Sequence, residues 1–250
     1  MSTSIVRATV RGLLSQFGYA IHRTSLLDGA PPDVDAQAVA LFRSVRPFTM
    51  TSIERVYALR ESVKYIIHHN IPGSIVECGV WKGGSMMAVA KTLMELKTER
   101  DLYLFDTFQG MPSPTAFDVD LHGVDANVLL KTNPMTPAIA PFEEVSRNMF
   151  STGYDRARIN FVRGKVEDTL PASAPAEIAL LRLDTDWYES TSHELVHLYP
   201  RLVKGGILII DDYGHFAGAK KAVDEYFQEH SIPIFLSRID YSVRLAVKPS

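Results

Sequence analysis

The sequence has very little cysteine and no excess of charge, and both shortages restrict what it can do. Cys78 is the single cysteine among 250 residues, which excludes an internal disulfide and any cysteine-rich metal site. The 26 basic and 29 acidic side chains leave a net charge of −3. Since nothing suggests a broad basic surface, we expect no nucleic-acid partner.

Long hydrophobic runs are missing as well. No stretch reaches the roughly 18 continuous apolar residues that a membrane-spanning helix needs. The N-terminal segment is not a good signal peptide, because its apolar residues recur at helical intervals, namely Ile5, Val6, Val10, Leu13, Leu14 and Phe17. This spacing predicts an amphipathic helix that either rests on a membrane surface or packs on the protein body or a partner subunit. We expect a cytoplasmic protein that forms a homodimer.

Length and composition indicate one globular domain with an N-terminal attachment. The chain is 46% apolar and 22% charged, as is typical of globular proteins, and single α/β domains often reach about 200–250 residues. Residues 1–46 are predicted to form a helical extension of the main domain, which covers 47–250. Within and just beyond that extension, residues 24–47 read as a loop, because Pro31 and Pro32 stand among acidic residues.

Strands and helices alternate along the main domain. Apolar runs predict strands over 74–80, 102–105, 159–162, 178–183 and 207–210, and periodicity predicts helices over 49–70, 83–97, 189–202 and 217–229. Continuous apolar strands are typical of a parallel sheet that helices cover on both faces. Two last strands, over 233–239 and 243–247, are joined too closely for a parallel crossover, so they must form an antiparallel hairpin.

An acidic residue stands at or near the carboxyl end of almost every predicted strand. These residues are Glu77, Asp106, Asp184, Asp211 and Asp212. One carboxylate at such a place often only caps a helix or a turn. Several on one edge repel one another unless a cation or ligand hydroxyls receive them. Because ligands of open α/β sheets bind beyond this edge, we expect the functional site there.

The first part of this site combines a glycine-bearing turn with an acid. Glu77–Ser85 reads as a strand end, a turn and a helix start, where the backbone can approach a ligand and offers free N–H groups. The turn is neither a GxGxxG fingerprint nor a P-loop. Asp106, at the end of the next strand, can accept both hydroxyls of a ribose. Together these features predict a nucleoside-bearing cofactor without a pyrophosphate.

The second part has the character of a metal site. Asp184 and Asp186 follow one strand, Asp211 and Asp212 follow another, and neighbouring strands lie about 4.8 Å apart. Oxygen ligands alone favour Mg²⁺, Ca²⁺ or Mn²⁺ over zinc. Asp184 can then bind metal while Asp186 accepts the proton of a substrate hydroxyl. The plainer alternative is that Asp186 and Asp212 only cap the helices that follow them.

Five motifs occur in a characteristic order: VECGVWKGGS, LFDTFQGMP, GKVEDTLP, LLRLDTDWYEST and GGILIIDDYG. Over about residues 47–249 the chain resembles the macrocin O-methyltransferase (TylF) family, which includes novobiocic acid methyltransferase-like enzymes. The resemblance implies a class I methyltransferase fold of the α/β class, with a Rossmann-like sheet of seven strands and an antiparallel last strand. It also implies S-adenosylmethionine- and Mg²⁺-dependent O-methylation of a small molecule that carries a sugar or phenol hydroxyl. The insertion at about 110–153 is then expected to form a lid or part of the acceptor pocket.

The resemblance further implies roles for single residues. Asp184, Asp211 and Asp212 would hold Mg²⁺, and Asp186 would be the general base. The segment Met50–Arg55 resembles the part of the family that covers the cofactor. The implied S-adenosylmethionine site consists of Met50, Thr51, Glu77, Gly79, Ser85, Asp106, Thr107, Phe108, Val166, Glu167, Asp168 and Asp184.

Two other functions stay open at this point. A metal-dependent hydroxylase on the same scaffold would normally need two histidines and a carboxylate, yet only His215 adjoins the carboxylate motifs. A non-catalytic cofactor-binding scaffold at a membrane surface would use the N-terminal helix, although every catalytic position is filled. His122 is either a second base or an exposed loop residue. Trp81 either shields the sulfonium of the cofactor or only packs.

Overall fold

A single sheet organises the chain in the computed structural model, which describes residues 30–133 and 135–249. The strands are β1 (Ser74–Cys78), β2 (Leu102–Asp106), β3 (Ile159–Arg163), β4 (Ile178–Leu183), β5 (Leu202–Ile210), β6 (Ser237–Arg238) and β7 (Arg244–Val247). Seven strands lie in the order β3-β2-β1-β4-β5-β7-β6. The first five are parallel, and β7 runs antiparallel to both β5 and β6. The predicted class I fold with an antiparallel last strand is confirmed.

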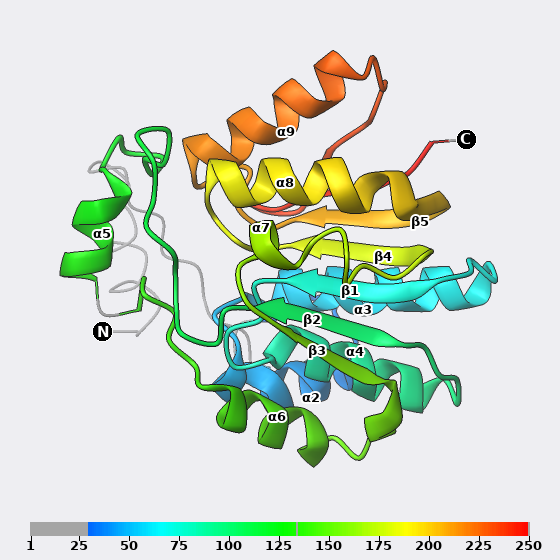
Figure 1. Ribbon diagram of the computed structural model, residues 1–250. Helices are drawn as coiled ribbons and strands as arrows, with labels where there is room; N and C mark the ends of the chain where they lie inside the picture. The colour runs from blue at the N-terminus through cyan, green and yellow to red at the C-terminus, as the bar shows by residue number, and fades with distance from the viewer. Residues whose placement is uncertain (1–29, 134, 250) are drawn as a thin grey trace, which may run out of the picture.

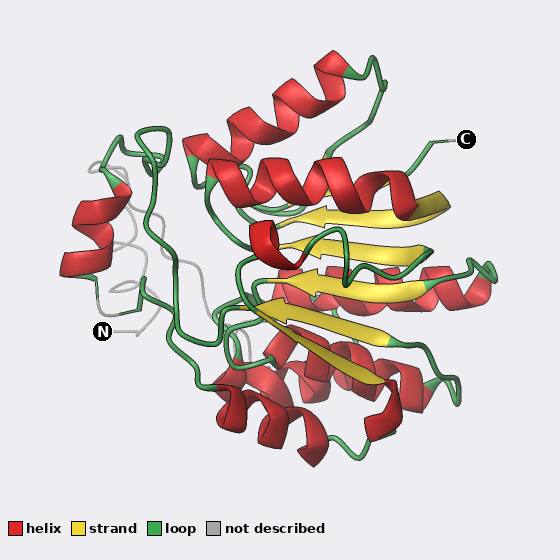
Figure 2. Cartoon of the chain, viewed as in Figure 1, coloured by secondary structure: helices red, strands yellow, loops and turns green. Residues whose placement is uncertain are grey.

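Helices cover both faces of the sheet (Figures 1 and 2). One face carries α2 (Ala36–Val45), α3 (Ile53–His68), α4 (Gly84–Glu95) and α6 (Phe142–Ser151), and the other carries α7 (Val166–Thr169), α8 (Tyr188–Leu198) and α9 (Ala217–Glu229). Short 3-10 helices occur at Arg46–Phe48, Arg156–Arg158 and Tyr199–Arg201. Strand residues alternate between the two resulting cores, with Ile75 in the first and Val76 and Cys78 in the second.

The predicted loop over residues 24–47 is wrong for most of its described part, because Ala36–Val45 is helical. Asp35 caps this helix, and its Oδ1 accepts a hydrogen bond from Ala38 N at 2.8 Å. Val39 is buried in a small apolar cluster that also contacts α3. The two prolines stand before the cap, where they do not interrupt helical hydrogen bonds.

The final hairpin is confirmed but shorter than predicted, because β6 contains two residues where seven were expected. In contrast, β4 and α9 match their predicted bounds. The amphipathic helix expected near the N-terminus lies outside the described residues. No helix in 30–133 or 135–249 combines the length and apolar character that crossing a membrane requires.

The 110–153 insertion contains α5 (Ala126–Thr132) and α6, and α5 lies beyond the carboxyl ends of the parallel strands (Figure 1). Asp118 ties the insertion to the body. This fully buried carboxylate accepts hydrogen bonds from Tyr188 N at 2.8 Å and from the amide and hydroxyl of Thr115 at 2.7 and 2.8 Å. The insertion therefore lies over the edge of the sheet where the site is expected, and its role as a lid stays a prediction.

Candidate active site

The turn after β1 is shaped by glycine and by backbone hydrogen bonds. Gly79 has φ +79°, and a Cβ at this position would lie 2.0 Å from the carbonyl oxygen of Asp184. Asp106 reaches back to the same turn, where its Oδ2 accepts from Val80 N at 2.8 Å and from Trp81 N at 3.1 Å. Its Oδ1 accepts from Phe108 N at 2.7 Å. Three amides therefore fix the orientation of one carboxylate.

Burial raises the pKa of Asp106, although these amides favour its ionised form. Asp106 lines a cavity beside this turn, and such concave sites are where small-molecule ligands bind. Seven of the residues predicted to bind the cofactor line this first cavity, namely Met50, Gly79, Asp106, Thr107, Val166, Glu167 and Asp184.

The other predicted cofactor residues lie elsewhere. Phe108 is buried among aromatic rings of the core, and Asp168 lines a separate neighbouring cavity. Glu77 is buried beneath the site, where it pairs with an arginine. Ser85 and Thr51 line a second cavity. Membership of a sequence motif was therefore not sufficient to place a side chain in the first cavity.

Three aspartates converge at the ends of β4 and β5. Asp184, Asp186 and Asp212 each offer a carboxylate oxygen, and these oxygens lie within 4.8 Å of one another. Asp186 adopts φ +67°, so the chain has already left the strand conformation at this residue. An oxygen-only set of this kind fits a hard divalent cation such as Mg²⁺. Within the described residues this is the one group of potential metal ligands, and it contains no histidine, which disfavours an iron-dependent hydroxylase.

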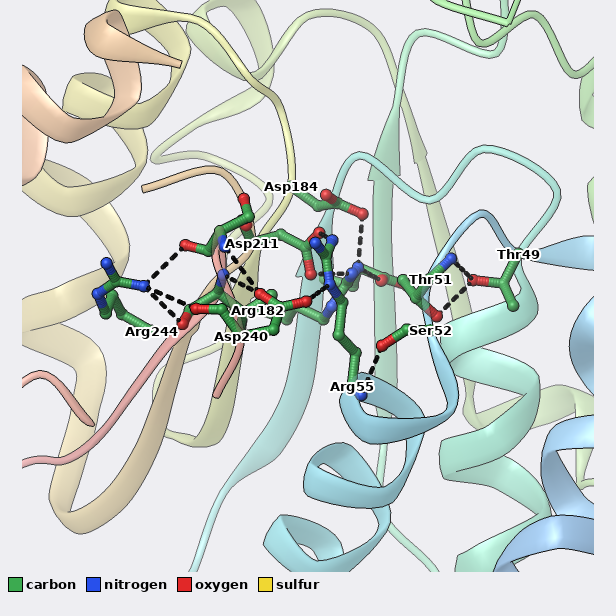
Figure 3. Close-up of polar contacts among 12 residues, drawn as sticks. Thr49, Thr51, Ser52, Arg55, Arg182, Asp184, Asp211, Asp240 and Arg244 are labelled. Atoms are coloured by element: carbon green, nitrogen blue, oxygen red, sulfur yellow. Dashed lines mark hydrogen bonds and ion pairs between the residues drawn. The ribbon is translucent and has the colours of Figure 1, made fainter. Parts of the chain in front are cut away.

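Asp211 was predicted to join the metal ligands, but its carboxylate is held by two arginines (Figure 3). Its Oδ2 accepts from Arg55 Nη1 at 2.7 Å, and its Oδ1 accepts from Arg182 Nη2 at 2.5 Å. In this arrangement both oxygens of Asp211 face guanidinium groups, so it is absent from the group that the other three aspartates form.

Arg182 is a buried cation near the carboxyl end of β4. Its Nη1 donates to Glu77, the residue opposite it on β1, and to Asp184 Oδ2 at 2.6 Å. The three carboxylates raise the pKa of Arg182 against the effect of burial. For Glu77 burial is the stronger influence and raises the pKa to about 7. Arg182 was not among the predicted site residues, although a lone charge inside the apolar run LLRL was a signal for it.

The remaining aspartates have raised pKa values. Burial is the main cause for Asp184 and for Asp212, and the neighbouring carboxylates add to it. Burial also raises the pKa of Asp186 to about 7, against a hydrogen bond with Asp212 that lowers it. An acid with a pKa near neutrality is suited to accept and release protons.

A second cavity is lined by Asp211 and Asp212 as well as by Asp184 and Asp186. Its wall includes Arg55, His215, Phe216 and Tyr241, which come from α3, the loop after β5 and the turn between β6 and β7. Both cavities are lined by Met50, Trp81, Ala138, Asp184 and Asp186. Two ligands, one in each cavity, would therefore meet beside the carboxylates.

Trp81, Trp187 and His122 have different positions in the structure. Trp81 lines both cavities, in a left-handed conformation with φ +45°. Trp187 is buried, and its Nε1 donates to Pro112 O at 3.0 Å. His122 is exposed to solvent. Of the three, Trp81 alone lies where the two ligands would meet.

Comparison with known proteins gives consistent matches. The macrocin-O-methyltransferase (TylF) family model matches residues 14–245, so the match begins well upstream of residue 47, where the motifs suggested it would begin. An enzyme of Streptomyces olivaceus, 8-demethyl-8-(2,3-dimethoxy-alpha-L-rhamnosyl)-tetracenomycin-C 4'-O-methyltransferase, is 35% identical over 219 residues, which are 87% of this chain and 82% of that enzyme.

A second relative and a solved structure agree with this. Demethyldecarbamoylnovobiocin O-methyltransferase of Streptomyces niveus is 35% identical over 193 residues, which are 77% of this chain and 72% of that enzyme. The structure of the O-methyltransferase NovP has a TM-score of 0.73 at 33% identity and covers 81% of this chain and 83% of its own. The chain therefore belongs to the macrocin O-methyltransferase family and is an O-methyltransferase.

Proposed function

We propose that the enzyme transfers the methyl group of S-adenosylmethionine to a hydroxyl of a sugar or phenol in a natural product or glycoconjugate, with Mg²⁺ as second cofactor. The observation that carries this proposal is the meeting of two cavities at Asp184 and Asp186. The acceptor class is supported by the S. olivaceus relative, whose name describes a rhamnosyl-bearing substrate.

The first cavity has the features that a nucleoside cofactor needs. Oδ1 of Asp106 accepts from one amide and can take a ribose hydroxyl in addition, whereas Oδ2 already accepts from two amides. Gly79 lines the cavity, and its missing side chain lets the turn after β1 pack directly against the backbone of Asp184. Val166 and Glu167 lie on the same cavity wall and would flank the adenine. Met50 borders both cavities and would cover the methyl-bearing end.

The second cavity would hold the acceptor. Mg²⁺, when bound, supplies positive charge that lowers the pKa of a neighbouring hydroxyl. Asp184 and Asp212 would hold it, and Asp211 would join them once Arg55 releases its Oδ2. Asp186 would take the hydroxyl proton as the acceptor oxygen forms its bond to the methyl carbon and the carbon–sulfur bond breaks. Orientation of the two substrates would supply much of the rate enhancement.

The test is a screen of hydroxyl-bearing acceptors by mass spectrometry for the gain of one methyl group. We expect methylation of a glycosylated or phenolic acceptor, its loss in EDTA and its recovery with added Mg²⁺. Full activity in EDTA would exclude the metal role. Failure to bind S-adenosylmethionine in a calorimetric titration would exclude methyl transfer itself and favour a non-catalytic scaffold.

The homodimer, the peripheral membrane contact and the cytoplasmic location are proposals of the same kind. They rest on the amphipathic spacing in residues 1–23, which lie outside the described residues. Sedimentation of the full chain would measure the first, and co-sedimentation with anionic vesicles the second. If the protein is a monomer and does not bind vesicles, the remaining role for this segment is packing on the protein body.

A further inference from the structure

Arg55 links parts of the site that lie far apart in the sequence. Its Nη1 donates to Asp211 Oδ2 at 2.7 Å, and its Nε donates to Asp240 Oδ2 at 2.6 Å. Its Cζ also lies 5.7 Å from the centroid of the Tyr241 ring. Figure 3 shows the side chain reaching from the start of α3 toward both aspartates. With 16% of its side chain exposed, Arg55 makes these contacts largely shielded from water.

Asp240 fixes the turn that carries Tyr241. Its Oδ1 accepts hydrogen bonds from Ser242 N and Val243 N, both at 2.8 Å. The hydroxyl of Ser242 donates to the carbonyl oxygen of Asp211 at 2.5 Å. The turn and the end of β5 are thus bonded to each other, and Arg55 joins this unit to α3.

The helix that carries Arg55 begins directly after the segment at Met50. Ser52 caps α3, with its Oγ accepting from Arg55 N at 3.4 Å, and the hydroxyls of Thr49 and Thr51 lie 2.9 Å apart just before it. Met50 and Thr51 line the second cavity, as Tyr241 does. Two walls of the second cavity are therefore held relative to each other through one guanidinium group.

Arg55 also competes with a metal cation for the negative charge of the carboxylates at the strand ends. Of the two arginines on Asp211, Arg182 is buried in the sheet and has two other carboxylate partners, whereas Arg55 enters from a helix outside it. Asp184, Asp186 and Asp212 form their group beside the same strand ends. A cation paired with one carboxylate of such a cluster lowers the attraction of the whole cluster for another cation.

We propose that Arg55 is a positioning residue with two separable effects. It holds the turn at Tyr241 as a wall of the acceptor cavity, and it restrains Asp211 so that the carboxylates bind a divalent cation less tightly than they would without it. The second effect rests on the proposed Mg²⁺ site. The first is independent of the metal.

The first experiment is calorimetric titration of the full-length protein with Mg²⁺ alone, in wild type and in Arg55→Gln. Glutamine keeps polarity but removes the charge. We expect the Kd for Mg²⁺ to fall by roughly three- to tenfold. Hydrogen exchange of the amides of Ser242 and Val243 should become faster in the same variant, because the turn has lost its link to α3. A variant that is only damaged would bind Mg²⁺ more weakly.

Asp240→Asn removes the other arm of the link. Asparagine can still accept the hydrogen bonds from Ser242 N and Val243 N, while Arg55 is left with Asp211 as its carboxylate partner. We expect faster exchange in the turn with a Kd for Mg²⁺ that is unchanged or higher. Both variants should therefore loosen the turn, but Arg55→Gln alone should bind Mg²⁺ more tightly, and tighter binding in Asp240→Asn would contradict the assignment of the charge effect to Arg55.

Arg60→Gln is the matched control, because Arg60 belongs to the same helix and pairs with Asp35, Glu61 and Glu95 away from both cavities. It should lower stability and leave Mg²⁺ binding and turn exchange unchanged. If Arg60→Gln tightens Mg²⁺ binding as Arg55→Gln does, the charge effect is not specific and the inference fails.

The inference also fails if Mg²⁺ binding in Arg55→Gln is unchanged or weaker. Should Arg55→Gln not fold, Arg55→Lys replaces it, because lysine keeps the charge but lacks the planar fork that spans two carboxylates. It should give faster turn exchange with unchanged Mg²⁺ affinity, and unchanged exchange would overturn the positioning role. Absence of Mg²⁺ binding in the wild type would refute the proposed metal site itself.

Discussion

The site at the carboxyl ends of the strands has two halves that are built in different ways: the cofactor half around Asp106, and the carboxylate half around Asp184, Asp186, Asp211 and Asp212. At the cofactor half, Asp106 is held by three backbone amides, and Gly79 stands where any side chain would clash with the backbone of Asp184. At the carboxylate half, Asp211 and its neighbours are held by the side chains of Arg55 and Arg182. The first half depends on local chain geometry. The second depends on a balance of charge among side chains from distant parts of the sequence.

Removal of Arg182 should break the second half completely. Arg182→Met leaves Glu77 buried without its cation, and loss of one partner of a buried ion pair costs about 3–5 kcal/mol in the free energy of unfolding. Urea denaturation measures this loss. Arg158→Met, which breaks exposed pairs with Glu99 and Asp101, is the control and should cost at most about 1 kcal/mol. Equal losses in the two variants would contradict the difference between buried and exposed pairs.

Asp186→Asn should abolish most of the methyl-transfer activity while leaving the structure of both halves intact. Asparagine tolerates the left-handed backbone of this position, so the fold should be retained. Loss of the base should lower turnover by about 10²- to 10⁴-fold, with unchanged affinity for S-adenosylmethionine. Turnover and Mg²⁺ affinity are to be measured together. If Mg²⁺ binding disappears as well, Asp186 is a metal ligand, and full turnover with metal bound would remove it from the mechanism.

Asp106→Ala should affect the cofactor half alone. The loss of one hydrogen bond to a charged acceptor predicts an S-adenosylmethionine Kd about 10 to 100 times higher, because such a bond contributes about 1.5–3 kcal/mol. Mg²⁺ affinity should not change. A fall in Mg²⁺ affinity of similar size would show that the two halves are coupled, and it would contradict their independence.

The smallest effect is expected far from both halves. Asp35→Ala removes the cap of α2 and should lower the free energy of unfolding by about 1 kcal/mol, without changing affinity for either cofactor. Thermal denaturation measures the shift. Asp35→Asn keeps a capping oxygen and should lose less. An effect on cofactor affinity would mean that α2 contributes to the site.

The same contrast explains what the sequence could predict. Apolar runs and the short final connection sufficed for the parallel strands and the hairpin, and strand ends located Asp106 and Asp184. These features depend on local pattern. The pair of Arg55 and Asp211 joins residues 156 positions apart, and no local pattern indicates it. The helix α2 was missed because the prolines before it were given more weight than the cap at Asp35.

Burial of the lone cysteine makes the chain convenient for site-specific labelling. Cys78 is fully buried on β1, and burial raises the pKa of its thiol well above the ordinary range, so its reaction with maleimides should be very slow. A cysteine introduced at Val128, which is 48% exposed on α5, would then be the reactive thiol of the whole chain. A fluorophore or spin label there would report movement of the insertion as substrates bind, without any change to the native cysteine.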